Sequence, residues 1–472
     1  MKTYKIYLAG EFVETTETLE VCNPYSKEIF AQTYLAGEEI INKAILAGLE
    51  AEKEMKQLNS LQKYEILMQI SNDILGDKKR LAAVLSKESG KPMRYALGEI
   101  ARAAQTFLVA AEESKRLPKE YLSLDWTAAG QGKEGLVKYF PIGLIAGIAP
   151  FNFPLNLAVH KIAPAIAAGN PIILKPARST PLSVLELAKI IDKTDLPKGA
   201  ISILPTDRVA GNILITDNRI KMLTFTGSPE VGWEMKKNAG KKKITLELGG
   251  NAGVIITETA NFENALAKTL IGSFAYSGQV CIHVQRIFVQ HSVFENFVEN
   301  FIAKVKQLKV GDPLESSTDI SVMIDEDNAS RVESWVNEAK AGGAKVLCGG
   351  NRKDGFYEPT VLTNTKSEMK VCSLEIFGPV VTLEPFSDFN KAIDEINHSV
   401  YGLQAGVFTN KISEMDYAFD NLEVGGVVIN DVPTFRVDHM PYGGVKNSGF
   451  GREGLKYAIH EMMEPRLLVK SV

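Results

Sequence analysis

A chain of 472 residues is too long for one ordinary hydrophobic core, so about two or three domains are expected. The residues are 45% hydrophobic and 23% charged, and the formal net charge is −4. This composition is typical of a globular protein, lacks the basic bias of nucleic-acid-binding proteins and gives no reason to expect a membrane partner. The N-terminal stretch has no apolar signal-peptide core, and the apolar runs are too short to span a bilayer. We therefore expect a soluble cytoplasmic protein.

The chain contains four cysteines, which are Cys22, Cys281, Cys348 and Cys372. No two of them form a C-x-x-C pair, so the sequence predicts neither a zinc site nor a dithiol redox motif, and no metal site of any other kind. So few cysteines in so long a chain are typical of a reducing compartment.

The first half of the chain predicts strands, then helices, then a hairpin. Residues 4–34 alternate like short strands, with turns at Ala9-Gly10 and Pro24-Tyr25. Residues 37–118 carry apolar residues at helical spacing, which predicts about three or four amphipathic helices, the last ended by Pro118. Residues 121–141 indicate an exposed hairpin, whose open edges another subunit would cover.

From residue 142 the pattern changes to short apolar runs that alternate with helical segments. The runs cover 142–150, 170–176, 200–205, 222–227 and 242–250, and the helical segments cover 160–169, 181–192 and 229–240. This alternation predicts a parallel, doubly wound α/β sheet. A second α/β region follows over 251–445, with strand-like runs at 286–290, 344–350 and 380–386. We find no internal repeat and no low-complexity segment.

Two stretches in the first α/β region indicate nucleotide binding. At FTGSPEVG, residues 225–232, a strand ends, Gly227 allows a tight turn, and Pro229 suits a first helical turn. The free N–H groups of such a helix start attract phosphate, although any strand-to-helix turn can look like this. Lys175 follows an apolar strand, where nucleotides bind in open α/β sheets. The alternative for Lys175 is a solvated side chain.

Three further residues are candidates for chemistry. Glu247 lies in the apolar run ITLELGGN, where burial would raise its pKa toward that of a general base, unless the residue faces solvent. Asn152 stands between two aromatic residues and before a proline, where its amide could serve an oxyanion or simply form a turn. Cys281, in SGQVCIH, is either a nucleophile or an inert buried thiol.

These stretches match a known family in their order along the chain. The motifs are PFNFP at 150–154, KP at 175–176, FTGS at 225–228, LELGG at 246–250, GQVC at 278–281, EIFGP at 375–379 and MPYGGVKNSGFGREG at 440–454. Glu247 precedes Cys281 by 34 residues, as the family pattern requires. The chain resembles the NAD(P)-dependent aldehyde dehydrogenase superfamily over essentially its whole length.

The resemblance implies the aldehyde dehydrogenase fold, which is an α/β fold. A Rossmann-like cofactor domain would comprise residues 1–120 and 142–250, and an α/β catalytic domain residues 251–445. A small β oligomerisation element would comprise residues 121–141 and 446–472, and would assemble a homodimer or homotetramer.

The resemblance also implies catalytic roles. Cys281 would attack the aldehyde, and Asn152 with the N–H of Cys281 would hold the oxyanion of the thiohemiacetal. Hydride transfer to the nicotinamide would leave a thioester, and Glu247 would then activate the water that releases the acid. Lys161 is a further family position close to the catalytic machinery.

A nicotinamide cofactor is implied as well. Lys175 would contact the adenosine ribose, Ser228 the pyrophosphate and Glu375 the nicotinamide ribose, with Phe377 packed against the cofactor; Phe225, Gly227 and Gly249 complete the implied set. Many NAD-preferring members carry a glutamate at the position of Arg178. Arg178 and Ser179 could instead accept a 2′-phosphate, which favours NADP⁺ or dual use, unless Arg178 simply points to solvent.

Residues 430–444 resemble the subgroup that oxidises small polar aldehydes such as lactaldehyde, glycolaldehyde and phosphono- or sulfo-acetaldehyde. Arg436 and His439 would bind a hydroxyl or an acidic group of the substrate. His160 follows Asn152 by about two helical turns and would face the same pocket, or be a satisfied core histidine. The predicted substrate contacts are Phe153, His160, Ile282, Arg436 and His439, whereas His283 is expected to face the fold.

Three other functions compete with this prediction. A CoA-acylating or succinate-semialdehyde-type dehydrogenase would share the scaffold, but CoA-acylating relatives usually lack the carboxylate at Glu247, so that residue favours hydrolysis. A cysteine hydrolase would not need the nucleotide motifs. A catalytically inactive homologue would not need Cys281, Glu247 and Asn152 together.

Overall fold

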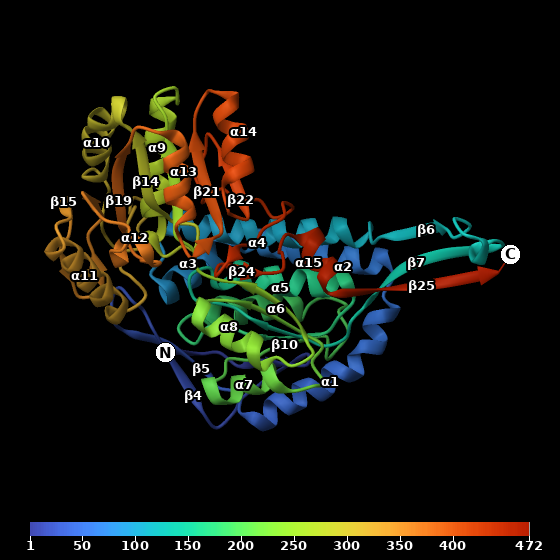
Figure 1. The fold of residues 1–472 in the computed structure, drawn as a ribbon. Coiled ribbons are helices and arrows are strands. Elements are labelled where there is room, and N and C mark those ends of the chain that lie inside the picture. Colours follow the sequence, from blue (N-terminus) through green and yellow to red (C-terminus); the bar gives the residue numbers. More distant parts are fainter. Residues whose placement is uncertain (472) are drawn as a thin grey trace.

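Two large sheets organise the computed structural model, which describes residues 1–471 (Figure 1). The first sheet has eight strands in the order β24-β12-β11-β8-β9-β10-β2-β3. The five inner strands run parallel, which confirms the prediction, and the strands at both ends join antiparallel. Their bounds are Gly449–Phe450, Lys243–Glu247, Met222–Thr226, Ile145–Ile148, Ile172–Lys175, Ile201–Ile203, Ile6–Leu8 and Glu11–Val13.

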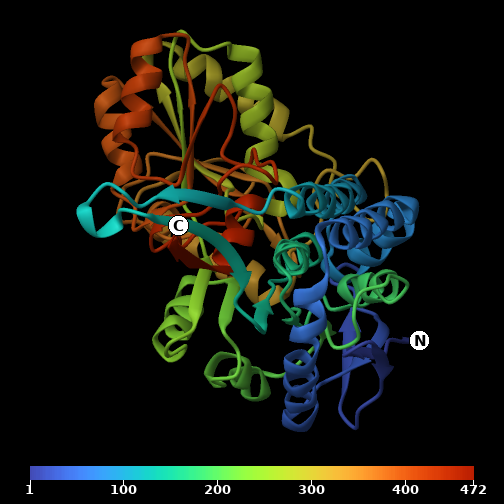
Figure 2. The same cartoon turned by 90° about the vertical axis from the view of Figure 1, so that its right-hand side faces the viewer.

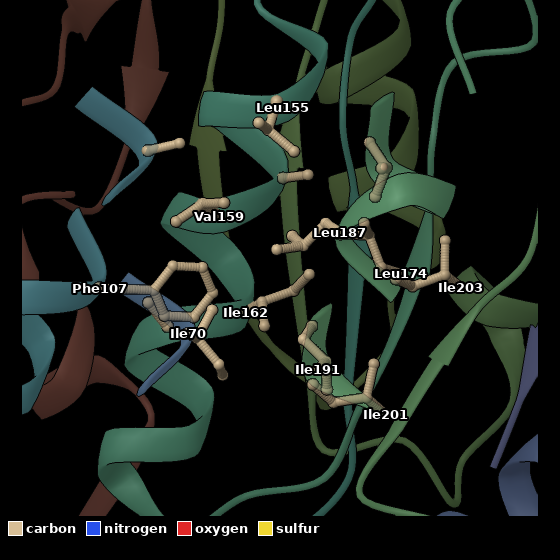
Figure 3. Packing of buried hydrophobic residues seen from close by; sticks show 14 of the residues in the cluster. Ile70, Phe107, Leu155, Val159, Ile162, Leu174, Leu187, Ile191, Ile201 and Ile203 are labelled. Atoms are coloured by element: carbon tan, nitrogen blue, oxygen red, sulfur yellow. The ribbon is translucent and has the colours of Figure 1, made fainter. Parts of the chain in front are cut away.

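Helices enclose this sheet. The connecting helices are α5 (Pro154–Ala168), α6 (Leu182–Ile191), α7 (Arg208–Thr216) and α8 (Pro229–Asn238), and the N-terminal helices are α1 (Glu38–Gln57), α2 (Ser60–Gly76), α3 (Lys78–Ser89) and α4 (Met93–Ser114). Figure 3 shows Ile70 and Phe107 beside Val159 and Ile162 of α5. Helix α5 is buried along its whole length, because α2 and α4 cover it on the side away from the sheet.

The predicted boundaries differ from the structure in two places. Helix α5 begins at Pro154, six residues before the predicted helical segment. Proline suits a first helical turn. The prediction started later because the residues of PFNFP are typical of a loop. Helix α7 is absent from the predicted helical segments. It begins after Asp207, whose side chain accepts a hydrogen bond from the N–H of Ala210.

The second sheet has seven strands in the order β15-β18-β19-β14-β13-β21-β22 and is parallel except for β15. Its strands are Lys345–Cys348, Thr360–Thr363, Val380–Phe386, Val284–Gln290, Ala252–Ile256, Gln404–Phe408 and Gly426–Ile429. Its helices are α9 (Phe262–Phe274), α10 (His291–Val305), α11 (Glu326–Ala341), α12 (Lys370–Ser373), α13 (Phe389–Asn397) and α14 (Ile412–Asn421). The three predicted runs in this region are therefore strands β14, β15 and β19.

A three-stranded sheet projects from the body of the molecule (Figure 1). The predicted hairpin forms its strands β6 (Lys119–Ser123) and β7 (Lys133–Pro141), and the C-terminal strand β25 (Met463–Ser471) pairs with β7 over all nine of its residues. Figure 2 looks along this projection, with the C-terminus toward the viewer. Within residues 1–471, no helix combines the length and apolar character needed to cross a membrane.

The remaining elements are short: β1 (Lys2–Thr3), β4 (Thr18–Cys22), β5 (Ile29–Tyr34), β16 (Arg352–Lys353), β17 (Phe356–Tyr357), β20 (Tyr401–Gly402), β23 (Val445–Lys446), the 3₁₀ turns η1 (Ala128–Gly130) and η2 (Ala275–Gly278), and α15 (Leu455–Glu461). The turns predicted at Ala9-Gly10 and Pro24-Tyr25 connect β2 to β3 and β4 to β5. The domain division stays a prediction; β24, inside the predicted tail element, pairs with β12.

Candidate active site

A strained turn presents Cys281. After α9 the backbone of Tyr276, Ser277 and Gly278 has φ angles of 50°, 54° and 68°, a left-handed run that L-residues rarely adopt. A Cβ atom on Gly278 would lie 2.1 Å from the carbonyl oxygen of Gly378, so only glycine fits there. The hydroxyl of Ser277 donates to the carbonyl of Ser321 at 2.7 Å and anchors the turn to the loop between α10 and α11.

The thiol of Cys281 is partly exposed and has one polar neighbour. Its sulfur lies 3.6 Å from the hydroxyl of Tyr442. Burial raises the pKa of Cys281 to about 11, and the contact with Tyr442 and the charge of Arg436 only partly oppose that shift. The thiol is therefore protonated at neutral pH and would have to lose its proton to act as a nucleophile.

Glu247 ends strand β12 and is 3% exposed, so the surface-facing alternative is wrong. Neither carboxylate oxygen has a hydrogen-bond partner within residues 1–471. Burial, followed by the negative charge of Glu453, raises the pKa of Glu247 well above its ordinary value. A buried, unpartnered carboxyl with a raised pKa has the properties of a general base near neutral pH.

Asn152 lies in the turn between β8 and α5 and is buried. Its amide nitrogen donates to the carbonyl of Gln279 at 3.0 Å, which ties this turn to the cysteine-bearing segment. A carboxamide nitrogen carries two N–H groups, so the second remains for an oxygen of a substrate. The backbone carbonyl of Asn152 accepts a hydrogen bond from Lys91 at 2.6 Å.

A buried ionic network adjoins Glu247. The ammonium of Lys161 donates to the hydroxyl of Thr226 at 2.8 Å and lies 3.3 Å from the carboxylate of Glu453, whose other oxygen accepts from Arg436 at 3.0 Å. Burial opposes ionisation of Glu453, but Lys161 and Arg436 outweigh it and lower its pKa to about 2. The sequence prediction missed Glu453, although a lone carboxylate in the glycine-rich 440–454 motif was the available signal.

Two arginines and a histidine extend this cluster of charged and polar side chains. The guanidinium carbon of Arg436 lies 3.7 Å from the ring centre of Tyr442. Asp438 accepts from Arg102 at 2.9 Å and lies 3.0 Å from His160. The Nε–H groups of both arginines are buried and have no partner within residues 1–471. The sequence prediction also missed Arg102, Asp438 and Tyr442. For Arg102, nothing in the local sequence of α4 indicates that its side chain reaches Asp438.

Of the other predicted substrate residues, Ile282, Phe153 and His160 contact residues of the site, whereas His439 is exposed. Ile282 is 5% exposed and packs with Tyr442 beside Cys281, and the ring of Phe153 lies edge-on to Tyr276 at 6.3 Å. His160 is buried and paired with Asp438, which makes it a satisfied histidine that also adjoins the arginines. His439 is exposed, and His283 is buried in the fold as expected.

The predicted cofactor residues lie at the carboxyl ends of the first sheet. Lys175 ends β9 and lies close to α7, since a Cβ on Gly211 would be 2.9 Å from its Cε atom. The ring of Phe225 lies against Gly227, where an added Cβ atom would be 2.4 Å from the ring. Ser228 is the exposed N-cap of α8, and its side chain makes no capping hydrogen bond. The first N–H groups of α8 are therefore available to a pyrophosphate.

Glu375 and Phe377 are the other predicted cofactor residues, and both pack closely against neighbouring segments. Glu375 accepts a hydrogen bond from the N–H of Gly250 at 2.9 Å, and burial raises its pKa to about 8. A Cβ on Gly249 would lie 2.3 Å from the Glu375 carboxylate, so the two residues form a tight cradle. Phe377 has a φ of 44° and stacks edge-on with Phe151 at 5.9 Å. Arg178 and Ser179 are exposed beyond the end of β9.

Known proteins share this architecture. The family model described as "Aldehyde dehydrogenase family" matches residues 12–468. The 3-sulfolactaldehyde dehydrogenase of Priestia aryabhattai is 42% identical over 470 residues, which is 99% of this chain and 98% of the relative. The lactaldehyde dehydrogenase of Methanococcus aeolicus is 41% identical over 471 residues, with 98% and 99% of the two chains covered.

Solved structures agree. Aldehyde dehydrogenase 21 of Physcomitrella patens, in complex with its reaction product succinate, superposes with a TM-score of 0.98 at 44% identity, covering 100% of this chain and 98% of that one. A glyceraldehyde-3-phosphate dehydrogenase of Methanocaldococcus jannaschii, complexed with NADP, gives a TM-score of 0.93 at 38% identity, with 97% and 100% covered. The chain therefore belongs to the aldehyde dehydrogenase family and is an NAD(P)-dependent oxidoreductase, as the ordered motifs predict.

Proposed function

We propose that this enzyme oxidises a small polar aldehyde to its carboxylic acid through a covalent intermediate on Cys281. One observation carries the proposal: a partly exposed thiol, a buried carboxyl without a partner and an amide with a spare N–H converge on one site, at Cys281, Glu247 and Asn152. The relatives named for lactaldehyde and sulfolactaldehyde support the substrate class.

The first step is attack of the Cys281 thiolate on the aldehyde carbon, which forms a carbon–sulfur bond and places negative charge on the former carbonyl oxygen. The spare N–H of Asn152 and the backbone N–H of Cys281 donate to that oxygen. Loss of one such donor typically costs about 10²- to 10³-fold in rate, so these contacts carry a large share of catalysis.

The second half of the reaction hydrolyses the thioester. The chemistry that a bound nicotinamide supplies is acceptance of the hydride from the tetrahedral carbon, and Glu375, Gly249 and the N-terminus of α8 would hold the cofactor. Glu247 then takes a proton from water, and the resulting hydroxide displaces the Cys281 thiolate and yields the acid. Lys161 and Arg436 supply positive charge that keeps the ionised form of Glu247 accessible.

Arg102 and Arg436 would recognise the polar end of the aldehyde. Each has a buried Nε–H without a partner, and an unpaired buried donor is costly unless a ligand satisfies it. Arginine donors match a sulfonate or carboxylate better than a neutral group, and relatives act on or release such anions. A hydroxyl or an acidic substituent close to the aldehyde is therefore favoured, with Phe153, His160 and Ile282 shaping the pocket and His439 at its exposed side.

For the cofactor we propose NADP⁺, or dual use of NADP⁺ and NAD⁺. Arg178 is exposed, forms no ion pair within residues 1–471 and lies two residues beyond the KP motif. No carboxylate stands at its position to repel a 2′-phosphate, and one solved neighbour was complexed with NADP. Arg178→Glu should then lower kcat/KM for NADP⁺ more than for NAD⁺, measured side by side.

We also propose that the enzyme is a homodimer or homotetramer. The projecting sheet exposes large apolar side chains, including Trp126 at 88% and Leu467 at 50%. An exposed sheet with open edges and apolar residues is usually covered by another chain. Light scattering on the purified protein should give the mass of a closed oligomer, and Leu467→Asp should reduce it.

The experiment that tests the function is a panel of aldehydes assayed with NAD⁺ and NADP⁺ in parallel. The panel contains lactaldehyde, 3-sulfolactaldehyde, succinic semialdehyde and an apolar aldehyde of similar size. We expect reduced nicotinamide and free acid from the polar members. Formation of product only with CoA would identify a CoA-acylating enzyme, and ester hydrolysis without any aldehyde oxidation would identify a cysteine hydrolase.

A further inference from the structure

Lys91 is a fully buried lysine that the proposed reaction does not use. It lies between α3 and α4, is 0% exposed, and forms a buried ion pair with Glu99 of α4. Its ammonium also donates to the backbone carbonyl of Asn152 at 2.6 Å. The rings of Phe153 and Tyr276 lie 3.8 Å and 4.4 Å from the same nitrogen. An ammonium has three N–H donors, and this surrounding provides an acceptor or aromatic face for each.

The ion pair connects Lys91 to the start of helix α5. The second oxygen of Glu99 accepts hydrogen bonds from the N–H groups of Leu155 and Asn156, both at 3.1 Å. A carboxylate at these two donors caps the first turn of the helix. Lys91 therefore holds the backbone of Asn152 directly, and its partner Glu99 holds the first turn of α5, which follows Asn152 in the chain.

The aromatic contacts connect Lys91 to the cysteine side. Tyr276 is the first residue of the left-handed turn that presents Cys281, and its hydroxyl donates to the carbonyl of Ser89, two residues before Lys91. Asn152 also donates to the carbonyl of Gln279 within the same turn. One ammonium thus contacts both segments whose relative position sets the distance from the amide of Asn152 to the sulfur of Cys281.

We propose that Lys91 is a positioning residue, which fixes the amide of Asn152 against the turn that carries Cys281. Burying a charge is costly unless it is paired and hydrogen-bonded, and an apolar residue would pack between two rings at lower cost. The ammonium is the group that can hold a carbonyl, a carboxylate and two aromatic faces at once. This inference rests on the proposed roles of Cys281 and Asn152.

The chain offers a matched control in Lys63. That lysine is also buried, at 7% exposed, and also donates to a carbonyl of α5, but to Ala167 at the opposite end of the helix at 3.2 Å. Lys91→Met and Lys63→Met both replace a buried ammonium with an apolar chain of similar length. Only the first change removes a contact to Asn152.

The test measures the pre-steady-state burst of reduced nicotinamide, which reports thiohemiacetal formation and oxidation before hydrolysis. A misplacement of about 1 Å can cost on the order of 10²-fold in rate. We expect Lys91→Met to slow the burst about 10- to 100-fold, with the cofactor dissociation constant within about twofold of the parent, and Lys63→Met to leave the burst rate essentially unchanged. If Lys91→Met does not fold, Glu99→Gln, which keeps the oxygen that caps α5, should also slow the burst.

A double-mutant cycle separates positioning from general destabilisation. If Lys91 acts through Asn152, Lys91→Met should cost little once Asn152 is alanine. Equal slowing in the parent and in the Asn152→Ala background, an unchanged burst in Lys91→Met, or equal slowing by Lys63→Met would overturn the inference. Failure of the proposed function would look different, because the parent enzyme itself would then show no burst that depends on Cys281.

Discussion

Two carboxylates lie in the same buried site, and their surroundings drive them to opposite protonation states. Glu453 pairs with Lys161 and Arg436, and its pKa is lowered to about 2. Glu247 has no hydrogen-bond partner within residues 1–471, and burial raises its pKa well above the ordinary value. Burial alone does not decide the state of a carboxyl group; close cations do. Glu453 therefore holds a fixed charge, whereas the raised pKa of Glu247 lets it take up a proton more readily than an ordinary carboxylate does.

The largest expected effect comes from Glu247→Gln. General base catalysis contributes about 10²- to 10⁴-fold, so steady-state turnover should fall by that amount. Formation of the thioester should persist, because Glu247 acts after it, and the burst of reduced nicotinamide should remain near one equivalent per active site. Rapid-mixing and steady-state assays on the same preparation measure both. A steady-state rate equal to that of the parent would remove Glu247 as the base.

Glu453→Gln should instead cost stability. Removing one partner of a buried ion pair leaves uncompensated charge on Lys161 and Arg436 and typically costs about 3–5 kcal/mol. Denaturant unfolding with and without the substitution measures the loss. The exposed pair of Lys43 and Glu39 on α1 is the control, since Glu39→Gln should leave the free energy of unfolding nearly unchanged. Equal losses for the two substitutions would contradict a fixed charge at Glu453.

Removing the charge of Glu453 and removing the charge of Lys161 should shift the pH profile of the reaction in opposite directions. Glu453 raises the pKa of Glu247 and Lys161 lowers it. Because Glu247 acts in hydrolysis of the thioester, its pKa governs the acid limb of kcat when hydrolysis limits turnover, so that limb should shift to lower pH in Glu453→Gln and to higher pH in Lys161→Met. Profiles measured with one substrate at saturating cofactor check this. Shifts of the same sign in both variants would show that neither charge acts on Glu247.

The smallest expected effect is on the pH dependence of the free energy of unfolding. A group whose folded pKa is raised stabilises the fold fully below its unfolded pKa and loses that contribution as pH rises. The parent should therefore lose stability relative to Glu247→Gln as the pH rises above about 4.5, the ordinary carboxyl value. Glu453 has the opposite sign, with stability lost as pH falls from about 4.5 toward about 2. Unfolding free energies across this range test both signs.

The sequence predicted the larger units of this fold well. Strand–helix alternation predicts the parallel sheet, the turn signal at Ala9-Gly10 lies where the chain reverses, and the hairpin predicted over 121–141 forms β6 and β7. The start of α5 at Pro154 and the whole of α7 were not predicted, because PFNFP and PTDRVAG contain loop-forming residues whose helical state depends on capping and packing.

Within the site, the sequence motifs predict the residues that lie inside them, such as Cys281 and Glu247. The sequence did not indicate the residues that act through space. Arg102 lies 336 residues from Asp438, and Lys91 lies 61 residues from Asn152. The state of Glu247 also depended on burial, since ITLEL alternates in a way that fits either face of a strand.

The most direct test of the central claim is to identify the covalent intermediate. Glu247→Gln should be mixed with aldehyde and oxidised cofactor, quenched with acid and analysed by peptide mass spectrometry. We expect an acyl group on Cys281 whose mass equals that of the aldehyde less one hydrogen, and none on Cys22, Cys348 or Cys372. An unmodified Cys281 during active reduction of the cofactor, or an acyl group on another cysteine, would contradict oxidation through a Cys281 thioester.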